Sequence, residues 1–501
     1  MNRAKLPPDG VSVPGHAVEQ NALRLVWATL RNSLAPSLGS ALAKDRAKRA
    51  DAALLRLVAG YEQLPALRAE FADRYTALLA QARALAGSGA PEVTRGAHGP
   101  RQGELVFVGA LDEAQEIEKL LVQLFDHAAG DPRVGAELDR LVREVVVTEA
   151  ACRGEYERRV MQMVPGAGID SERSREVTAP ALQRYLRSHP GASPDVVVAE
   201  AAEIPGGRSK RTVLVRLDTA GPLPPELVLR LDTGRGVGTS VLEEFPLLDR
   251  VARLGLPVPV PLWLESSPEP FGFPFIVFRR MAGASAGDLI EGAFRKEPTT
   301  ALALARALAR VHAGGRQLVD PAECGSSVSH TRQLLTHYHD WWRSKKPFPS
   351  LVVESAFMWM FRRLGDRLGE PTVVHADTGF HNLLLDDAGN GCLLDWEFAH
   401  FGDPAEDLAS CRPAVEKCMP WEGFLAEYQA HGGGAISDFR LNYFEVWRPL
   451  RNAAVCGTVL HSLMHGEADD IDPVTIALST FQRLQADLAR SLEAVIARVG
   501  V

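Results

Sequence analysis

The chain contains 501 residues, of which 46% are hydrophobic and 24% are charged. This balance is typical of a folded globular protein and excludes a largely disordered chain. The 55 Lys and Arg residues are outnumbered by 63 Asp and Glu residues, which argues against a nucleic-acid partner because such proteins carry clustered positive charge. The six cysteines include no Cys-x-x-Cys pair, and no apolar stretch is long enough to span a membrane. We therefore expect a cytoplasmic protein of about two to four domains with no membrane partner.

The first third of the chain has the pattern of a helical domain that follows a short flexible end. Residues 1–15 are rich in Pro and Gly, so we expect them to be poorly ordered. Apolar residues then recur at helical spacing, which predicts an all-α domain at residues 16–165. Its clearest helices are expected at residues 64–85, 111–128 and 135–163. No catalytic pattern occurs in this domain, and its role is left open between forming a homodimer, covering the acceptor cleft and binding a pathway partner.

The pattern changes after residue 175. Short runs rich in β-branched and apolar residues predict strands, and one amphipathic run before Gly255 predicts a helix at residues 240–254. The strands are expected at residues 196–204, 211–217, 227–231 and 275–278. Helical patterns dominate again from residue 300, apart from a strand–loop–strand block at residues 372–396. The sequence thus predicts an α+β fold.

The strand–loop–strand block carries the most informative residues. An apolar strand leads into the loop His375-Ala-Asp-Thr-Gly-Phe-His-Asn382, and residues 386–391 have the composition of a hairpin turn. Folding back at this turn brings Asp377, Asn382 and Asp395 to one end of a small sheet. Phosphoryl transfer needs a carboxylate that orients the acceptor hydroxyl and an oxygen-rich pair that holds Mg²⁺ against a nucleoside triphosphate. We therefore predict Asp377 as the catalytic base and Asn382 and Asp395 as metal ligands, with ATP and Mg²⁺ as cofactors.

This block, with Asp395-Trp-Glu397 and the later segment Gly402-Asp-Pro-Ala-Glu-Asp-Leu-Ala409, resembles the signature of the aminoglycoside phosphotransferase-like (choline-kinase-like) small-molecule kinases. The resemblance covers about residues 175–495. It implies a bilobal protein-kinase-like fold, with a small β-rich N-lobe at residues 175–282 and a helical C-lobe that holds the acceptor site at residues 283–501. The all-α domain would precede this fold.

Two nucleotide-binding features of the family have counterparts in the expected N-lobe. Pro205–Thr212 is similar to the glycine-rich loop whose backbone N–H groups approach the phosphates. The resemblance assigns phosphate contacts in this loop to Gly206, Gly207 and Ser209. Lys210 stands where the family usually has Asn, which leaves open whether it contacts phosphate. Residues 274–283 resemble the hinge strand, so backbone groups of Arg279 and Met281 are expected to hydrogen-bond adenine.

The third counterpart is a buried ion pair. The strand at residues 226–230 resembles the one that carries the phosphate-anchoring cation, which is Arg230 in this chain. Arg keeps the charge of the Lys found in many relatives and presents it as a planar fork. Glu244, on the following helix, matches the usual carboxylate partner of this cation, and Glu243 is the competing assignment.

Several other residues are given structural roles. His375 is expected to brace the loop, and Ala376, which replaces a common Gly of the family, is expected to be tolerated at a negative φ. Asp407 is expected to cap or pin a helix N-terminus. A structural role or a solvated surface is also favoured over an acceptor-pocket or metal-site role for Trp341, Trp342, Trp447, Arg448, His461, His465 and the acidic run at residues 467–472.

The predicted function is ATP- and Mg²⁺-dependent phosphorylation of a hydroxyl group on a small-molecule metabolite. Arg230 and the Asp-Trp-Glu block resemble the branch of kinase domains associated with acyl-CoA dehydrogenases, which implies a hydroxyacyl-CoA acceptor. The alternative is an aminoglycoside or other antibiotic phosphotransferase. Residues 403–472 contain 12 Asp and Glu residues against 5 Lys and Arg residues, which favours the cationic acceptor of that alternative.

Two other classes are weighed. A catalytically silent kinase-like binding module would keep the fold without the transfer, but the intact Asp377, Asn382 and Asp395 argue against it. A protein kinase is disfavoured because the chain lacks a Gly-x-Gly-x-x-Gly loop and a His-Arg-Asp motif.

Overall fold

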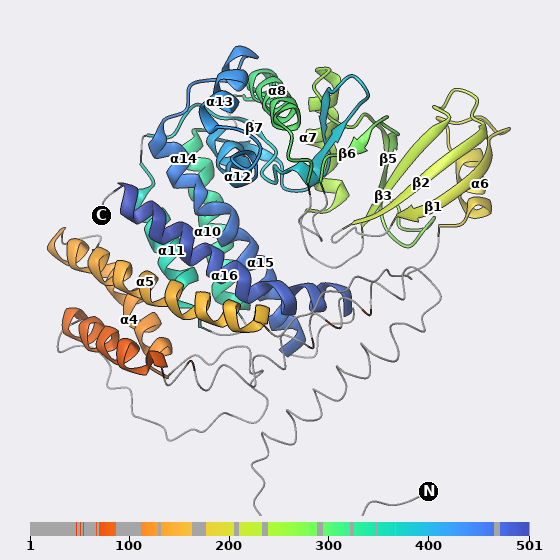
Figure 1. Ribbon diagram of the computed structural model, residues 1–501. Helices are drawn as coiled ribbons and strands as arrows, with labels where there is room; N and C mark the ends of the chain where they lie inside the picture. The colour runs from red at the N-terminus through yellow and green to blue at the C-terminus, as the bar shows by residue number, and fades with distance from the viewer. Residues whose placement is uncertain are drawn as a thin grey trace, which may run out of the picture.

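The structure is a computed structural model in which a β-rich lobe lies at one end of the molecule and helices make up the rest (Figure 1). It describes residues 47, 51, 54, 67, 70–86, 112–128, 132–162, 177–204, 210–232, 239–287, 294–320, 325–346, 349–365, 367–464 and 471–499. The expected flexible end at residues 1–15 lies outside these ranges. The two lobes and the preceding helices give the predicted α+β arrangement.

The β-rich lobe is built around a five-stranded antiparallel sheet in the order β1-β2-β3-β5-β4. Its strands are β1 Val197–Ile204, β2 Lys210–Thr219, β3 Glu226–Asp232, β4 Pro261–Glu265 and β5 Phe275–Arg279. Four of the five strands were predicted. The sequence analysis missed β4, in which every residue is partly buried, so no alternation of buried and exposed positions marks it as a strand.

The central strand β3 faces two environments. Leu227 and Leu229 are fully buried on the face covered by α6 (Ala179–Ser188). Successive side chains of a strand point to opposite faces, so Arg230 points to the other face, where α7 (Val241–Arg253) packs. This alternation aims a cation from the middle of the sheet toward a helix, and α7 matches the helix predicted there.

The helical lobe surrounds two small sheets. The predicted strand–loop–strand block forms β7 (Thr372–Val374), a 3₁₀ turn at Phe380–Asn382, β8 (Leu383–Leu385) and β9 (Gly391–Leu393). β6 (Ala284–Ser285) pairs with β8, and β10 (His400–Gly402) pairs with β7. The helices are α8 Pro298–Gly315, α10 Ser327–Lys345, α11 Leu351–Arg363, α12 Ala405–Val415, α13 Trp421–Ala430, α14 Asp438–Glu445, α15 Trp447–Met464 and α16 Ile471–Val499.

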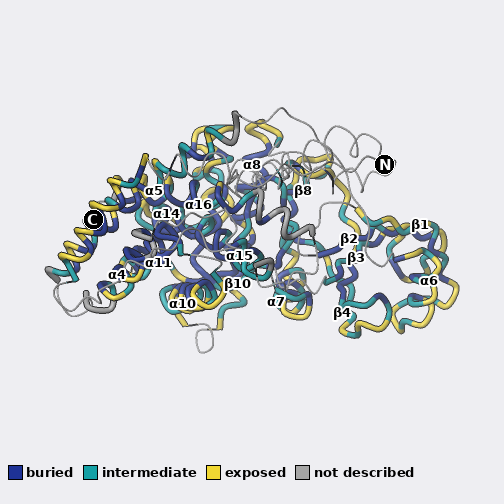
Figure 2. The backbone as a smooth tube through the Cα atoms, turned by 90° about the horizontal axis from the view of Figure 1, so that it is seen from below, coloured by how far each residue is buried: buried dark blue, intermediate teal, exposed yellow. Residues whose placement is uncertain are grey.

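The N-terminal helices pack directly on the helical lobe. They comprise residues 70–86, α4 (Asp112–Ala128) and α5 (Pro132–Gln162), and α4 and α5 lie close to the predicted helices. α5 runs along α16, and both α4 and α5 contact α11 (Figure 1). Buried positions run without a break between α5, α11 and α16 (Figure 2).

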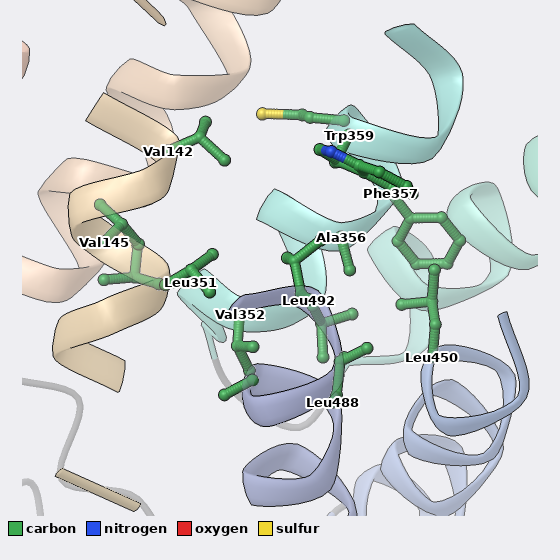
Figure 3. Packing of buried hydrophobic residues seen from close by; sticks show 14 of the residues in the cluster. Val142, Val145, Leu351, Val352, Ala356, Phe357, Trp359, Leu450, Leu488 and Leu492 are labelled. Atoms are coloured by element: carbon green, nitrogen blue, oxygen red, sulfur yellow. The ribbon is translucent and has the colours of Figure 1, made fainter. Parts of the chain in front are cut away.

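This shared core is apolar and closely packed. The side chains that meet at its centre are Val142 and Val145 of α5, Leu351, Val352, Ala356, Phe357 and Trp359 of α11, Leu450 of α15, and Leu488 and Leu492 of α16 (Figure 3). Independent folding of residues 16–165 stays a prediction, but α4 and α5 pack against α11, and α5 also packs against α16. None of the described helices combines the length and the apolar character needed to cross a bilayer.

Candidate active site

A cleft of about 1230 Å³ lies between the β-rich lobe and the helical lobe. This volume exceeds the roughly 300–1,000 Å³ of a typical small-molecule site, so the cleft has room for two substrates. All predicted site residues that the structure describes line it: Arg230, Glu244, Arg279, Met281, Asp377, Asn382 and Asp395. The remaining predicted residues, Gly206, Gly207 and Ser209, lie outside the described residues.

The loop after β7 is held by Asp407, which reaches it from α12. The carboxylate accepts the backbone N–H groups of His375 at 2.8 Å and Ala376 at 2.7 Å. Arg451 donates to the carbonyl oxygen of Ala376 at 2.7 Å. These bonds hold Ala376 at a φ of 63°, so the negative φ at which Ala was expected to be tolerated is not the one it adopts. A left-handed conformation is costly for a residue with a Cβ and persists where its surroundings dictate it.

The expectation that Asp407 caps a helix was also wrong. Asp407 lies within α12 and is fully buried, and it is Asp403 that accepts the N–H of Ala405, the first residue of that helix, at 2.8 Å. His312 Nε2 lies 2.9 Å from the Asp407 carboxylate. Burial alone would raise the pKa of Asp407, but the hydrogen bond and charge of His312 and the contacts from His375 lower it. A carboxylate with a lowered pKa therefore anchors the loop.

Asp377 sits in the cleft among cationic side chains. Arg448 Nη2 and Arg451 Nη2 lie 3.3 Å and 3.5 Å from its Oδ1 atom, and His381 Nε2 lies 3.6 Å from Oδ2. Burial raises the pKa of this carboxyl, but Arg448, His381 and Arg451 together hold it well below its usual range. The carboxylate is ionised at physiological pH and can accept a hydrogen bond from a substrate hydroxyl.

Asn382 and Asp395 complete the constellation. The amide nitrogen of Asn382 donates to the Asp377 carbonyl oxygen at 3.0 Å and to its carboxylate at 3.1 Å. The amide oxygen is therefore the atom of Asn382 that could bind a cation. Asp395 adopts a φ of 64°, and its neighbour Leu394 donates its N–H to the carbonyl oxygen of Asn382 at 2.8 Å.

This donor set fits Mg²⁺ bound partly through a nucleotide. Within the described residues, no group of three or more His, Cys, Asp and Glu side chains is arranged to hold a metal. Mg²⁺ in nucleotide sites uses one or two protein oxygens and takes its other ligands from phosphates and water. Asn382 and Asp395 supply two such protein oxygens.

Arg230 links Asp395 of the helical lobe to Glu244 on α7 of the other lobe. Its Nη2 donates to Asp395 Oδ1 at 2.6 Å, and its Nη1 lies 3.4 Å from Glu244 Oε1. Glu243 instead accepts the N–H of Ser240 in the capping box of α7, so the structure places Glu244 beside the cation. Burial raises the pKa of Glu244 against the influence of Arg230. Burial also disfavours the charged guanidinium, but Asp395 and Glu244 raise the pKa of Arg230.

Lys210 has turned away from solvent. Its ammonium lies 3.4 Å from the carboxylates of both Asp232 and Glu397, and it donates to the carbonyl oxygen of Thr239. The side chain is only 4% exposed. Lys210 thus joins β2 of one lobe to the loop after Asp395 in the other, and its charge is already matched by protein carboxylates.

The hinge segment forms one wall of the cleft. The N–H of Arg279 donates to the carbonyl oxygen of Val260 at 3.1 Å, so its carbonyl oxygen is the group that could meet adenine. Met281 lines the cleft two residues later. The apolar side chains around this end are Ile204, Leu214, Val228, Leu248, Phe278, Leu384 and Leu394.

The other end of the cleft is bounded by α12, α14, α15 and α16. Its charged lining residues are the cations Lys417, Arg448, Arg483 and Arg490 and the carboxylates Glu445 and Asp487. The acidic composition of residues 403–472 therefore gave a misleading expectation for this surface. Several of its carboxylates are turned inward: Asp403 pairs with Arg440, and Glu406 accepts from Trp447 at 2.9 Å.

The sequence analysis did not identify Arg451, Lys417, Arg483 or Arg490. They carry no local motif, and only the one-turn spacing of Arg448 and Arg451 gives a signal. Of the residues given structural roles, Trp342 and Trp447 are buried, and Arg448 lines the cleft. His465 and the side chains of residues 467–472 lie outside the described residues.

Residues 200–450 match the sequence profile of the phosphotransferase enzyme family. The chain belongs to this family. The match covers half of the chain, and it confirms the predicted recognition and the predicted enzyme class of small-molecule phosphotransferases.

Curated relatives cover the same part of the chain. The chain is 26% identical over 241 residues to mouse acyl-CoA dehydrogenase family member 10, covering 46% of this chain and 22% of the relative. It is 23% identical over 239 residues to rat acyl-CoA dehydrogenase family member 11, covering 46% of this chain and 30% of the relative. The chain therefore matches less than a third of the length of these relatives.

Solved structures are similar at lower identity. A macrolide 2'-phosphotransferase type I shares 18% identity with a TM-score of 0.44, covering 62% of this chain and 99% of its own. A choline/ethanolamine kinase family protein from Mesorhizobium loti shares 20% identity with a TM-score of 0.40, covering 63% of this chain and 98% of its own.

Proposed function

We propose that this phosphotransferase uses Mg²⁺ and ATP to phosphorylate a hydroxyl group of a small anionic metabolite. The observation that carries the proposal is the convergence of Asp377, Asn382 and Asp395 in one cleft between a buried cation, Arg230, and an open cationic end. Asp377 would orient the acceptor hydroxyl and take its proton late in the transfer.

The remaining roles follow from the contacts of each side chain. Arg230 would steady the phosphates, positioned by Glu244, and the hinge carbonyl of Arg279 with the backbone of Met281 would hold adenine. Asn382 and Asp395 would hold Mg²⁺, which when bound neutralises charge on the transferred phosphoryl group. Gly206, Gly207 and Ser209 keep their proposed contact with the phosphates.

For the acceptor, we favour a hydroxyacyl-CoA. Support comes from the cations Lys417, Arg448 and Arg483 at the acceptor end, because a CoA ester carries several phosphates, whereas a polycationic aminoglycoside would be repelled there. The relatives named above as acyl-CoA dehydrogenase family members point the same way. An aminoglycoside acceptor and a silent binding module are the competing outcomes.

The proposal is tested with purified protein, Mg²⁺-ATP and three acceptor sets: hydroxyacyl-CoAs, amino alcohols and aminoglycosides. We expect phosphorylated product from the first set. Asp377→Asn should lower kcat by about 10²–10⁴-fold while leaving the affinity for Mg²⁺-ATP within a few-fold. The matched control is Asp218→Asn, an exposed carboxylate on β2 whose loss should change nothing.

Calorimetry separates the alternatives. Binding of Mg²⁺-ATP that is weakened in Asp395→Asn supports the metal site. Nucleotide binding without transfer to any acceptor would identify a silent module, and transfer to aminoglycosides alone would identify an antibiotic-modifying enzyme.

A further inference from the structure

One face of α16 packs in the protein core, and another lines the cleft. One face carries Phe481, Leu488 and Leu492, which are fully buried in the core shared with α5 and α11. The other face lines the acceptor end of the cleft with Thr480, Arg483, Leu484, Asp487 and Arg490. Both sets recur at three- and four-residue spacing, as expected for two separate stripes of one helix. A displacement of α16 on its core face would therefore move the wall of the cleft.

A buried polar chain ties α16 to the N-terminal helices. Tyr75 donates its hydroxyl to Glu149 at 2.5 Å, and Arg153 donates its Nε to the same carboxylate at 2.8 Å. Arg153 then donates its Nη1 to the side-chain oxygen of Gln482 on α16 at 2.9 Å. Gln482 is buried, and the next residue is Arg483. Since buried polar groups need their partners, these bonds fix the rotation of α16 about its axis.

Arg483 differs from its charged neighbours on that wall. Arg490 pairs with Asp487, and Glu445 pairs with Arg498 at 2.8 Å. Arg483 is exposed, and no carboxylate in the described part of the chain lies within ion-pair distance of it. Asp487, which already pairs with Arg490, attracts its guanidinium only from beyond ion-pair distance, so the five donors of Arg483 are available to whatever occupies this end.

α5 and α16 both lie outside the segment that matches the family profile. We propose that the N-terminal helices are part of the acceptor site: through Arg153 and the shared core, α5 positions α16, which presents Arg483 as a specificity-determining cation for a phosphate-bearing acceptor. This inference rests on the proposed function and gives the first third of the chain a role within the cleft.

The first test measures binding of free coenzyme A by calorimetry, with Mg²⁺ and a non-hydrolysable ATP analogue saturating the nucleotide end. We expect Arg483→Gln to weaken this binding about tenfold, since it removes charge-assisted hydrogen bonds, and Arg483→Lys to recover most of the loss. The matched control is Arg253→Gln, which removes an exposed Arg of α7 that does not line the cleft and should leave the affinity unchanged. Absence of coenzyme A binding by the wild type, or equal affinity in Arg483→Gln, overturns the inference.

The second test addresses α5. Arg153→Met should weaken coenzyme A binding several-fold and speed hydrogen exchange in residues 480–491, with the affinity for the ATP analogue unchanged. Arg140→Met, which alters an exposed Arg of the same helix, is the control. If Arg153→Met fails to fold, Gln482→Leu removes the same interhelical bond from the other side. Wild-type affinity and exchange in the folded variant refute the role of α5.

Phosphoryl transfer is assayed separately in both tests. Coenzyme A binding that depends on Arg483 without any transfer would contradict the proposed function and leave the acceptor-site inference standing. Transfer to an anionic hydroxyl acceptor other than a CoA ester that is insensitive to Arg483, with no coenzyme A binding, would leave the proposed function standing and overturn the acceptor-site inference.

Discussion

At the proposed nucleotide end of the cleft, Arg230 and Lys210 are 13% and 4% exposed, and each lies within 3.4 Å of two carboxylates. At the acceptor end, Lys417 and Arg483 are exposed and have no carboxylate partner among the described residues. Buried charges are costly unless matched, so the first arrangement fixes geometry. Exposed unmatched charges cost little and remain available to a ligand. One end of the cleft is thus preorganised and the other is receptive.

We expect the largest effect from removing the N-terminal helices, which support α16 at the acceptor end of the cleft. Deleting residues 1–163 removes Leu138, Val145 and Val146, which are fully buried, and exposes their partners on α11 and α16. Each such side chain contributes about 1.5–3 kcal/mol, against a total stability of roughly 5–15 kcal/mol. We expect no soluble, cooperatively unfolding protein, as judged by size exclusion and circular dichroism.

The control for this deletion is removal of residues 1–15, which we expect to be tolerated. A soluble 164–501 fragment that unfolds cooperatively and binds Mg²⁺-ATP would show that the two lobes fold without the N-terminal helices. It would favour an independent domain at residues 16–165.

Arg230→Met tests whether the nucleotide end depends on matched charge. The variant leaves Glu244, which is fully buried, without its cation, and breaking a buried ion pair costs about 3–5 kcal/mol. We expect this loss in the free energy of unfolding from urea denaturation, together with weaker ATP binding. Arg216→Met, on an exposed position of β2, is the control. An unchanged unfolding midpoint would mean that the pairing is not structural.

The pH dependence of the reaction tests whether Arg448, at the acceptor end, controls the ionisation of Asp377. Cationic neighbours hold the pKa of Asp377 well below its usual range, so the carboxylate stays ionised as pH falls and should produce no acidic limb between pH 5 and 7. In Arg448→Gln the strongest of these lowering influences is gone while burial still raises the pKa. We expect kcat/KM of this variant to fall at the acidic end of the range.

The shape of that profile, rather than its height, is the readout, because Arg448 also lines the acceptor end. Matching profiles for wild type and Arg448→Gln would show that Arg448 does not govern the ionisation of Asp377.

The smallest effect is expected at Ala376. Its left-handed φ of 63° costs roughly 1–2 kcal/mol for a residue with a Cβ. Ala376→Gly removes this strain but adds freedom to the unfolded chain, so we expect a net stabilisation of at most about 1 kcal/mol in thermal unfolding, with kcat unchanged. Clear destabilisation would mean that the Cβ packs better than its backbone angle suggests.

The sequence predicted the elements that are encoded locally. The loop at residues 375–382 and the hairpin turn at residues 386–391 follow from short-range residue types, and four of the five strands of the main sheet follow from their apolar patterns. The placement of Asp377, Asn382 and Asp395 in one cleft matches the prediction, while their catalytic roles stay proposals. The contacts of Lys210 could not be predicted from local patterns, because its partner Glu397 lies 187 residues away.

Longer-range features could not be foreseen. The φ of Ala376 is set by Asp407, whose side chain comes from a helix about 30 residues later. The cationic wall of the cleft depends on which face of α16 is turned inward, and that orientation depends on packing against α5. Counting charges over residues 403–472 could not predict this surface, because the count cannot tell inward-facing carboxylates from those that face the cleft, and Arg483 and Arg490 lie outside that range.

The pairing of α5 with α16 also constrains how the protein is made. α5 ends at Gln162 and α16 begins at Ile471, so about 300 residues must be synthesised after α5 before its partner exists. At roughly 5–20 residues per second, this interval lasts about 15–60 s. During that time α4 and later α11 cover part of α5, but the part that packs on α16 stays exposed and is a target for chaperones that bind apolar segments. Limited chaperone capacity should therefore reduce the yield of folded protein more than a change in final stability would.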